Sequence, residues 1–285
     1  GACLKKHFRR LQKAFFGHAQ GREMNREKIR SEFQSYVSHY DPSDPKIRLK
    51  IDHTYRVADL CERIAGSLSL SEEMTEISWI CGMLHDIGRF EQVQRFHTFL
   101  DAESVDHAKL GAEILFGEEQ LIRRFLEETK WDEQIRDAIY WHSAYQLPEN
   151  LKEDPFCRIL RDADKLDILR VNLETPLEDI YNVTTKELRT SEVTPEVMEA
   201  VKGHHTVLRS KKKSPVDHVV GHICLTFELA YPESRKILKE QGYLDRMLHF
   251  ESENPVTRQQ FETIREEMQR YLETGDERRK GTDGN

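Results

Sequence analysis

Long apolar runs are missing from this sequence of 285 residues. The longest stretch without Asp, Glu, Lys or Arg runs from Ala138 to Pro148. A helix that crosses a bilayer needs ~18–20 apolar residues. We therefore expect no membrane span in this protein.

An excess of positive charge is also missing. The chain has 43 basic and 51 acidic residues, which gives a formal net charge of -8. A general nucleic-acid binder is expected to be basic, because it must neutralise phosphates. The charge balance disfavours that class, and we expect no nucleic-acid partner.

Cysteine is scarce and shows no metal-binding or redox spacing. The five cysteines form no Cys-x-x-Cys motif, and most of them lie in apolar helical patterns. Free, unpatterned cysteines are typical of proteins in a reducing compartment. We therefore expect a cytoplasmic location.

Helical periodicity dominates the sequence, and convincing alternation of the strand type is absent. Apolar residues recur at spacings of three and four from Asp52 to Leu68, and Ser71 opens a second helix. Further helices are expected around Leu110–Leu115, Ile135–Ile139, Phe156–Ala163, Pro195–Lys202, Val216–Tyr231 and Pro255–Leu272. The sequence thus predicts an all-α fold.

Four of these helices each carry one polar side chain on the face that their apolar residues define. His53 lies four residues before Val57, and Asp164 lies four residues after Leu160. His107 lies three residues before Leu110, and His142 lies three residues after Ile139. Residues three or four apart share a helix face, so we expect all four side chains to point inward.

A fifth position combines two such groups, because His85 and Asp86 are adjacent and are followed by Gly88. Neighbours on a continuous helix diverge by about 100°. They can share a centre only near a helix end or through a bridging geometry. A single inward histidine is usually a satisfied core residue. Several of them with two aspartates form the nitrogen and oxygen donor set of a divalent transition metal.

The order of these residues resembles a known pattern. His53, then His85-Asp86, then Asp164 within Arg161–Asp167 resembles the H…HD…D signature of the HD superfamily of metal-dependent phosphohydrolases. The similar stretch runs from about Lys50 to Arg170. The resemblance implies an HD-domain-like helical bundle with additional C-terminal helices, and it implies His53, His85, Asp86 and Asp164 as metal ligands. Asp162 and Asp167 are candidates to support those ligands.

His107 and His142 fall where members of the superfamily with two metals, including the HD-GYP type, have additional histidines. Two features differ from that type, because Ser143 follows His142 in place of a second histidine and no Gly-Tyr-Pro triplet follows. The resemblance therefore implies one or two divalent ions, with Mn, Fe, Mg, Ni, Co and Zn all left open because the same donors accept each of them.

The resemblance also implies a domain organisation. We expect an N-terminal helical arm at 1–45 and an HD-type metal-binding core at 46–175. We expect C-terminal helices at 176–273, packed on the core as part of the same domain, and a flexible tail at 274–285.

The expected chemistry is hydrolysis of a phosphomonoester or phosphodiester of a nucleotide or another small phosphorylated compound, with water activated by the metal. Asp86, Arg89 and Lys165 are the candidate catalytic residues. Arg89, Arg95 and His97 are the candidate substrate contacts, since cations stabilise phosphoryl oxygens. The alternative is a sensor or scaffold in which the metal only stabilises the fold.

Two weaker patterns lie further along the chain. His218 and His222 are four residues apart and could bind zinc, but the sequence offers no third ligand for them. The run Lys211-Lys212-Lys213 is most simply a solvated loop. A basic amphipathic stretch near the N-terminus, Lys5–Phe15, is expected to pack on the domain or to form an arm, with a membrane surface or a partner helix as the alternative.

Overall fold

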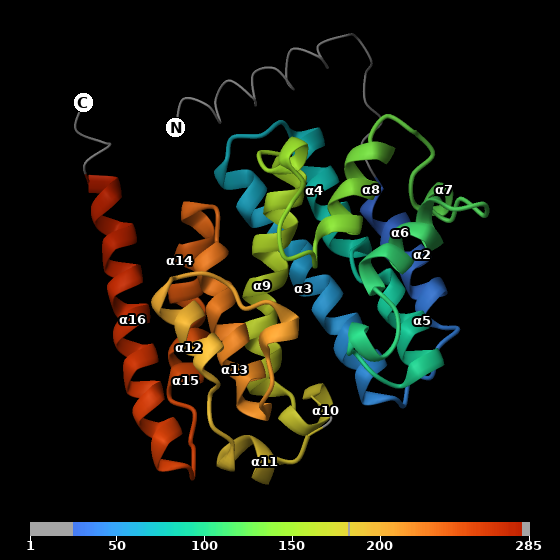
Figure 1. Cartoon of the computed structure of the whole chain (residues 1–285). Coiled ribbons are helices and arrows are strands. Elements are labelled where there is room, and N and C mark those ends of the chain that lie inside the picture. The colour runs from blue at the N-terminus through green and yellow to red at the C-terminus, as the bar shows by residue number, and fades with distance from the viewer. Residues whose placement is uncertain (1–24, 182, 281–285) are drawn as a thin grey trace. The chain divides into compact units, whose positions relative to one another are not determined.

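The computed structural model describes residues 25–181 and 183–280 (Figure 1). Every regular element in these ranges is a helix, so the all-α prediction is confirmed. No helix in the same ranges is both long and apolar enough to cross a membrane. The basic stretch Lys5–Phe15 and most of the expected N-terminal arm lie outside the described residues, as does the end of the expected tail.

The chain forms two compact units. Among the described residues, the first comprises 25–95 and 105–161, and the second comprises 96–104, 162–181 and 183–280. Helix α9 (Pro155–Glu174) belongs to both, because the division falls between Arg161 and Asp162. The domain boundaries expected at 45, 175 and 273 remain predictions.

Several helices of the first unit begin after a residue whose side chain caps them. Its elements are α2 (Arg26–Val37), α3 (Pro45–Ser67), α4 (Glu72–Leu84), α5 (Ile87–Phe96), α6 (His107–Phe116), α7 (Ile122–Phe125), α8 (Asp132–Trp141) and the short 3₁₀ helix η2 (Glu149–Leu151). Ser71 caps α4 by accepting a hydrogen bond from the backbone of Met74, and Asp44 caps α3 in the same way through Lys46. Such a cap contributes about 1 kcal/mol to stability.

The core of the first unit lies where α3 packs on α4 and where α8 packs on α4 and α6. Val57, Ile64, Ile80, Leu84 and Ile139 are completely buried there. Burying one such side chain contributes roughly 1.5–3 kcal/mol. This core fixes the helix ends that carry the polar residues described below.

The second unit consists of shorter helices around α13. Its elements are η1 (Asp101–Glu103), α10 (Leu177–Tyr181), α11 (Thr185–Thr190), α12 (Pro195–Lys202), η3 (Arg209–Lys211), α13 (Pro215–Ile223), η4 (Cys224–Glu228), α14 (Pro232–Gln241), α15 (Tyr243–Leu248) and α16 (Pro255–Lys280). Helix α13 packs against α11, α12 and α15, and α16 packs against α12 and α15. The completely buried Val197, Val220 and Ile264 belong to this core.

Two helix boundaries differ from the sequence prediction. The helix expected at Val216–Tyr231 ends at Ile223, continues as η4 and is extended at Tyr231. The buried carboxylate of Asp162 accepts hydrogen bonds from the backbone of Ala230 and Tyr231, which holds these residues outside a helix. Helix α16 continues past Leu272 to Lys280.

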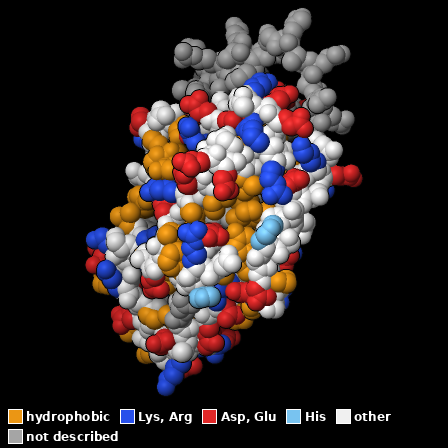
Figure 2. Space-filling model, turned by 90° about the vertical axis from the view of Figure 1, so that its right-hand side faces the viewer, with side chains coloured by type: hydrophobic (Ala, Val, Ile, Leu, Met, Phe, Trp, Pro, Cys, Tyr) orange, Lys and Arg blue, Asp and Glu red, His pale blue; other side chains and the backbone are white. Residues whose placement is uncertain are grey.

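Acidic and basic side chains are interleaved over the face drawn in Figure 2. No broad patch of basic side chains covers the described residues visible on that face.

Candidate metal centre

His85 and Asp86 lie at a junction between two helices. Helix α4 ends at Leu84, His85 forms its C-terminal cap, and α5 begins at Ile87. The chain therefore leaves the regular helix at the adjacent pair, as the sequence required if both side chains were to reach one centre. The junction is buried, with both side chains at most 3% exposed.

The carboxylate of Asp86 lies between two pairs of imidazoles. Its Oδ2 atom is 3.5 Å from Nε2 of His53 and 3.4 Å from Nε2 of His85. Its Oδ1 atom is 3.5 Å from Nε2 of His107 and 3.7 Å from Nε2 of His142. Within each pair the two Nε2 atoms are close as well, at 3.3 Å for His53 and His85 and 3.1 Å for His107 and His142. Five of the predicted site residues thus converge.

Two of the histidines are oriented by the helix ends on which they lie. Nδ1 of His85 lies 2.7 Å from the carbonyl oxygen of Gly82, and Nδ1 of His142 lies 2.6 Å from that of Ile139. A carbonyl only accepts, so each Nδ1 carries the hydrogen and donates it. The lone pair of each ring is then on Nε2, the nitrogen that faces Asp86.

The close approach of α5 and α6 brings His107 to this centre. His107 is the first residue of α6, and Gly88 lies in the first turn of α5. A Cβ atom on Gly88 would lie 2.6 Å from the backbone nitrogen of Gly111, which leaves no room for a side chain. A Cβ atom on Gly111 would in turn lie 3.3 Å from the backbone nitrogen of Gly88, so the two glycines together permit the close approach.

Lys50 is a residue of this centre that sequence reasoning missed. Its Nζ atom lies 2.7 Å from Oδ2 of Asp86. Burial alone would raise the pKa of Asp86, but the charge of Lys50 contributes to lowering it well below its usual value. Lys50 lies three residues before His53, on the same face of α3, and this spacing is the signal that could have identified it.

The donor set suits divalent metal ions. His53, His85 and Asp86 form one group whose ligand atoms lie within 4.8 Å of one another, and Asp86, His107 and His142 form a second. All five residues are buried. Neutral imidazole nitrogens and carboxylate oxygens bind transition metals well. Each group offers three ligands, and Asp86 is common to both.

The predicted substrate contacts lie at different depths. Nη1 of Arg89 donates a hydrogen bond to Oε1 of Gln92 at 2.6 Å, and Nε of Arg89 is 3.7 Å from Oδ1 of Asp86. Arg95 is exposed and forms an ion pair with Glu91. His97 is exposed, has a positive φ of 55°, and belongs to the second unit. Of these three predicted substrate contacts, Arg89 is the one that the structure places close to Asp86.

Asp164 and Lys165 lie on the part of α9 that belongs to the second unit. Asp164 is partly buried, and neither of the two histidine–aspartate groups includes it. Lys165 donates a hydrogen bond to Glu228 at 2.6 Å. The roles that the sequence suggested for these two residues remain predictions.

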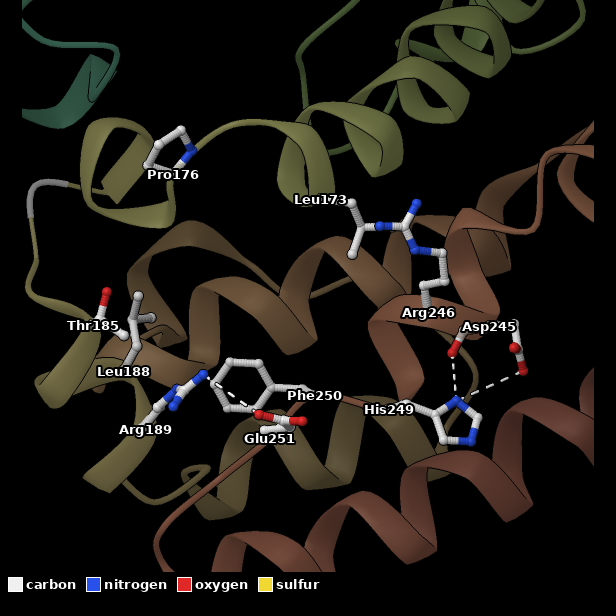
Figure 3. Close-up of a pocket in the computed structure, with 10 residues that line it drawn as sticks. All are labelled: Leu173, Pro176, Thr185, Leu188, Arg189, Asp245, Arg246, His249, Phe250 and Glu251. Carbon is white, nitrogen blue, oxygen red and sulfur yellow. Dashed lines mark hydrogen bonds and ion pairs between the residues drawn. The ribbon is translucent and has the colours of Figure 1, made fainter.

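The second unit also has a cavity of about 810 Å³ (Figure 3). Leu173, Leu188 and Phe250 contribute its apolar lining. Two of its charged residues form an ion pair, in which Nη2 of Arg189 lies 3.5 Å from Oε2 of Glu251. None of the site residues predicted from the sequence lines this cavity.

Comparison with known proteins adds one finding. The family model described as HD domain matches residues 51–169 of the chain. No curated protein and no solved structure matches the sequence of this chain. The matched range contains both histidine–aspartate groups and ends shortly after Lys165.

Proposed function

Because residues 51–169 are an HD domain, we propose that this protein is a metal-dependent phosphohydrolase. Its substrate is a phosphomonoester or phosphodiester of a nucleotide or of another small phosphorylated compound. The observation that carries the proposal is the position of Asp86, whose two carboxylate oxygens each face a different pair of histidines.

The two pairs would hold two divalent ions, with Asp86 as their common ligand. When bound, such an ion lowers the pKa of a water ligand towards neutrality and polarises a phosphoryl oxygen. The protein supplies the imidazole ligands, and their own Nδ1 hydrogen bonds fix the orientation of two of them, His85 and His142. It also supplies a carboxylate that stays ionised at neutral pH.

Arg89 is the residue of the first unit that we propose to contact the phosphoryl oxygens. Its guanidinium is held by Gln92, a completely buried side chain that itself donates to the carbonyl oxygen of Val105 at 3.0 Å. The Arg89 side chain remains 13% exposed, so it can reach a ligand from solvent. A guanidinium forms two parallel hydrogen bonds with phosphate oxygens, which orients the substrate.

The experiment is an assay of the purified chain against a panel of phosphomonoesters and phosphodiesters, together with elemental analysis. We expect Asp86→Asn and His85→Ala to reduce hydrolysis by about 10³-fold or more, because they remove metal ligands. The matched control is Asp59→Asn, an exposed carboxylate on α3, which should leave hydrolysis unchanged.

Hydrolysis that survives in Asp86→Asn would overturn the proposal. Bound metal without hydrolysis of any phosphoester would support the alternative, a sensor or scaffold that the metal stabilises. Elemental analysis separates one ion from two, since loss of His107 and His142 should halve the metal content if each pair holds one ion.

The cellular location belongs to the same proposal. The described cysteines, Cys61, Cys81, Cys157 and Cys224, are all buried free thiols. Buried thiols without disulfides are typical of a reducing compartment. We therefore keep the cytoplasm as the proposed location and a small phosphorylated molecule as the proposed partner.

A further inference from the structure

The second unit contains three basic side chains that the proposed hydrolysis does not use. These are Lys212, His218 and His222, which we call the basic cluster. The two histidines lie one turn apart on α13, and Lys212 lies just before that helix. The sequence alone allowed zinc binding by His218 and His222. In the described residues, however, no group of three potential metal ligands includes either histidine.

The side chain of Lys212 lies against α13. A Cβ atom on Gly221 would be 2.7 Å from Nζ of Lys212, so the absence of a side chain at Gly221 makes room for the lysine. Gly221 is adjacent to His222 and three residues after His218, and the charge of Lys212 acts on both histidines. The expectation of a solvated loop is therefore wrong for Lys212, because the lysine packs across a glycine instead of extending into water.

The ammonium of Lys212 has no hydrogen bond or ion pair with any residue of the described ranges. The neighbouring carboxylate of Asp217 is fully engaged elsewhere. It accepts hydrogen bonds from the backbone of Thr194, Lys213 and Ser214 and from the Thr194 hydroxyl, at 2.8–3.0 Å. Burial, with the charge of Arg209, lowers the pKa of Lys212 to about 8. The charge of Asp217 acts in the opposite direction with a smaller effect, and no carboxylate of the described residues forms a direct ion pair with Lys212.

The hydrogen bonds of His222 fix which nitrogen carries the proton. Its Nδ1 atom lies 3.0 Å from Oδ1 of Asn172 and 2.6 Å from the hydroxyl of Tyr181. Nδ2 of Asn172 donates to the carbonyl oxygen of Ile168 at 2.9 Å, which identifies Oδ1 as the acceptor. Nδ1 of His222 therefore carries the hydrogen, and Nε2 carries a lone pair with no partner in the described ranges.

Both histidines are neutral at pH 7. Burial and the charge of Lys212 lower the pKa of His218 to about 4, and the same two causes lower that of His222 well below its usual value. Asp164 acts on His222 in the opposite direction, with a smaller effect. His218 stacks on the ring of Tyr181, with 5.0 Å between the ring centroids, and this stacking holds it in the cluster.

We propose that the basic cluster binds an oxyanion that keeps one proton at neutral pH, with inorganic hydrogen phosphate as the ligand. The ammonium of Lys212 donates charge-assisted hydrogen bonds to the anion, which gives it the direct ion pair that no carboxylate of the described residues provides. Nε2 of His222 accepts the hydrogen of the P–OH group, which a fully deprotonated anion cannot offer.

This donor and acceptor pattern predicts selectivity. Sulfate has the same shape as hydrogen phosphate but carries no proton at pH 7.5, so it leaves Nε2 of His222 unpaired. A phosphomonoester has a second pKa of about 6 and has also lost its proton at this pH. Free phosphate should therefore bind more tightly than either of them.

The test is isothermal titration of the full chain at pH 7.5 with inorganic phosphate, sulfate and glycerol phosphate. It is repeated in the Asp86→Asn background, in which both groups of potential metal ligands lose their common residue. We expect phosphate to bind at least tenfold more tightly than sulfate or glycerol phosphate in both backgrounds. Lys212→Met should weaken phosphate binding at least tenfold, whereas Lys211→Met, a change at an exposed neighbour, should leave it within twofold.

Phosphate binding that Lys212→Met leaves intact would overturn the proposal, as would equal affinities for phosphate and sulfate. Loss of phosphate binding in Asp86→Asn would place the anion at the metal centre and would overturn it as well. Lys212→Gln serves as a second variant if Lys212→Met does not fold. The outcome is independent of the proposed hydrolysis, which the phosphoester assay tests separately.

Discussion

Nζ of Lys50 lies 2.7 Å from Oδ2 of Asp86, and the two side chains are 12% and 3% exposed. A lysine and a metal ion would compete for this carboxylate, since both neutralise it. We expect Lys50→Met to lower the free energy of unfolding of the metal-free protein by about 3 kcal/mol, because a buried charge loses its partner. Added Mn²⁺ should then stabilise the variant more than the native chain.

The measurement for Lys50 is urea denaturation with and without Mn²⁺. Lys46→Met is the matched control, because Lys46 lies one turn earlier on α3 and its side chain makes no ion pair in the described ranges. Equal losses of stability in the two variants would contradict the role assigned to the Lys50–Asp86 pair.

Gly88→Ala should damage the metal centre through the backbone. The new Cβ would meet the backbone of Gly111 at 2.6 Å. Relieving that overlap would move α6 and His107 away and cost about 3 kcal/mol of stability. Thermal unfolding and metal content are the measurements, and both should fall.

Gly66→Ala is the control for this prediction. Gly66 lies near the end of α3, and nothing lies within 4 Å of its Cβ position. Alanine favours a helix by about 1 kcal/mol over glycine, so this variant should be as stable as the native chain or more so. A Gly88→Ala variant that retained its metal would show that α5 and α6 need not approach so closely.

His218 should make stability depend on pH. Its folded-state pKa of about 4 is lower than the ordinary value, because of burial and the charge of Lys212, while Asp217 acts in the opposite direction. The stabilising contribution is therefore complete above about pH 6.5 and is lost as the pH falls from there towards 4. We expect a loss of up to about 1 kcal/mol per pH unit, since His218 is partly exposed.

The measurement for His218 is the urea midpoint between pH 7.5 and pH 5. His218→Phe keeps the stacking on Tyr181 and cannot be protonated, so its midpoint should vary less with pH. The exposed His249 provides the control His249→Phe, which should keep the native pH profile. Identical profiles for His218→Phe and the native chain would refute the prediction.

Asp162→Asn should destabilise the second unit. The carboxylate accepts hydrogen bonds from Ala230, Tyr231 and the hydroxyl of Ser234, all between 2.6 and 3.0 Å. An amide nitrogen in this position would face donors, so we expect a loss of about 3 kcal/mol. Hydrogen exchange at Tyr231 should accelerate in Asp162→Asn, and Asp245→Asn, at an exposed position, should show no change.

Local sequence signals were sufficient for much of the fold and of the metal centre. Ser71 marked the start of α4, and Pro195–Lys202 was predicted with the bounds that the structure shows. The inward spacing of His53, His107 and His142 predicted their convergence, because helix periodicity defines which face a side chain shares with apolar neighbours.

Features that depend on distant residues were not predictable in this way. The end of α13 depends on Asp162, which lies far away in the sequence and binds the backbone after η4. Lys50 was missed because lysine is normally exposed, so its spacing from His53 carried little weight. The packing of Lys212 on Gly221 requires a tertiary contact that no local pattern shows.

The Nδ1 hydrogen bonds of His85 and His142 run to carbonyl oxygens only three residues earlier in the chain. Each ring is therefore held in its metal-binding orientation by a hydrogen bond to its own helix, and this hydrogen bond does not require a bound cation. Exchange of one metal for another then requires no refolding, and the same imidazoles serve several first-row ions. We expect the ion found in the purified protein to reflect the supply of metals during growth.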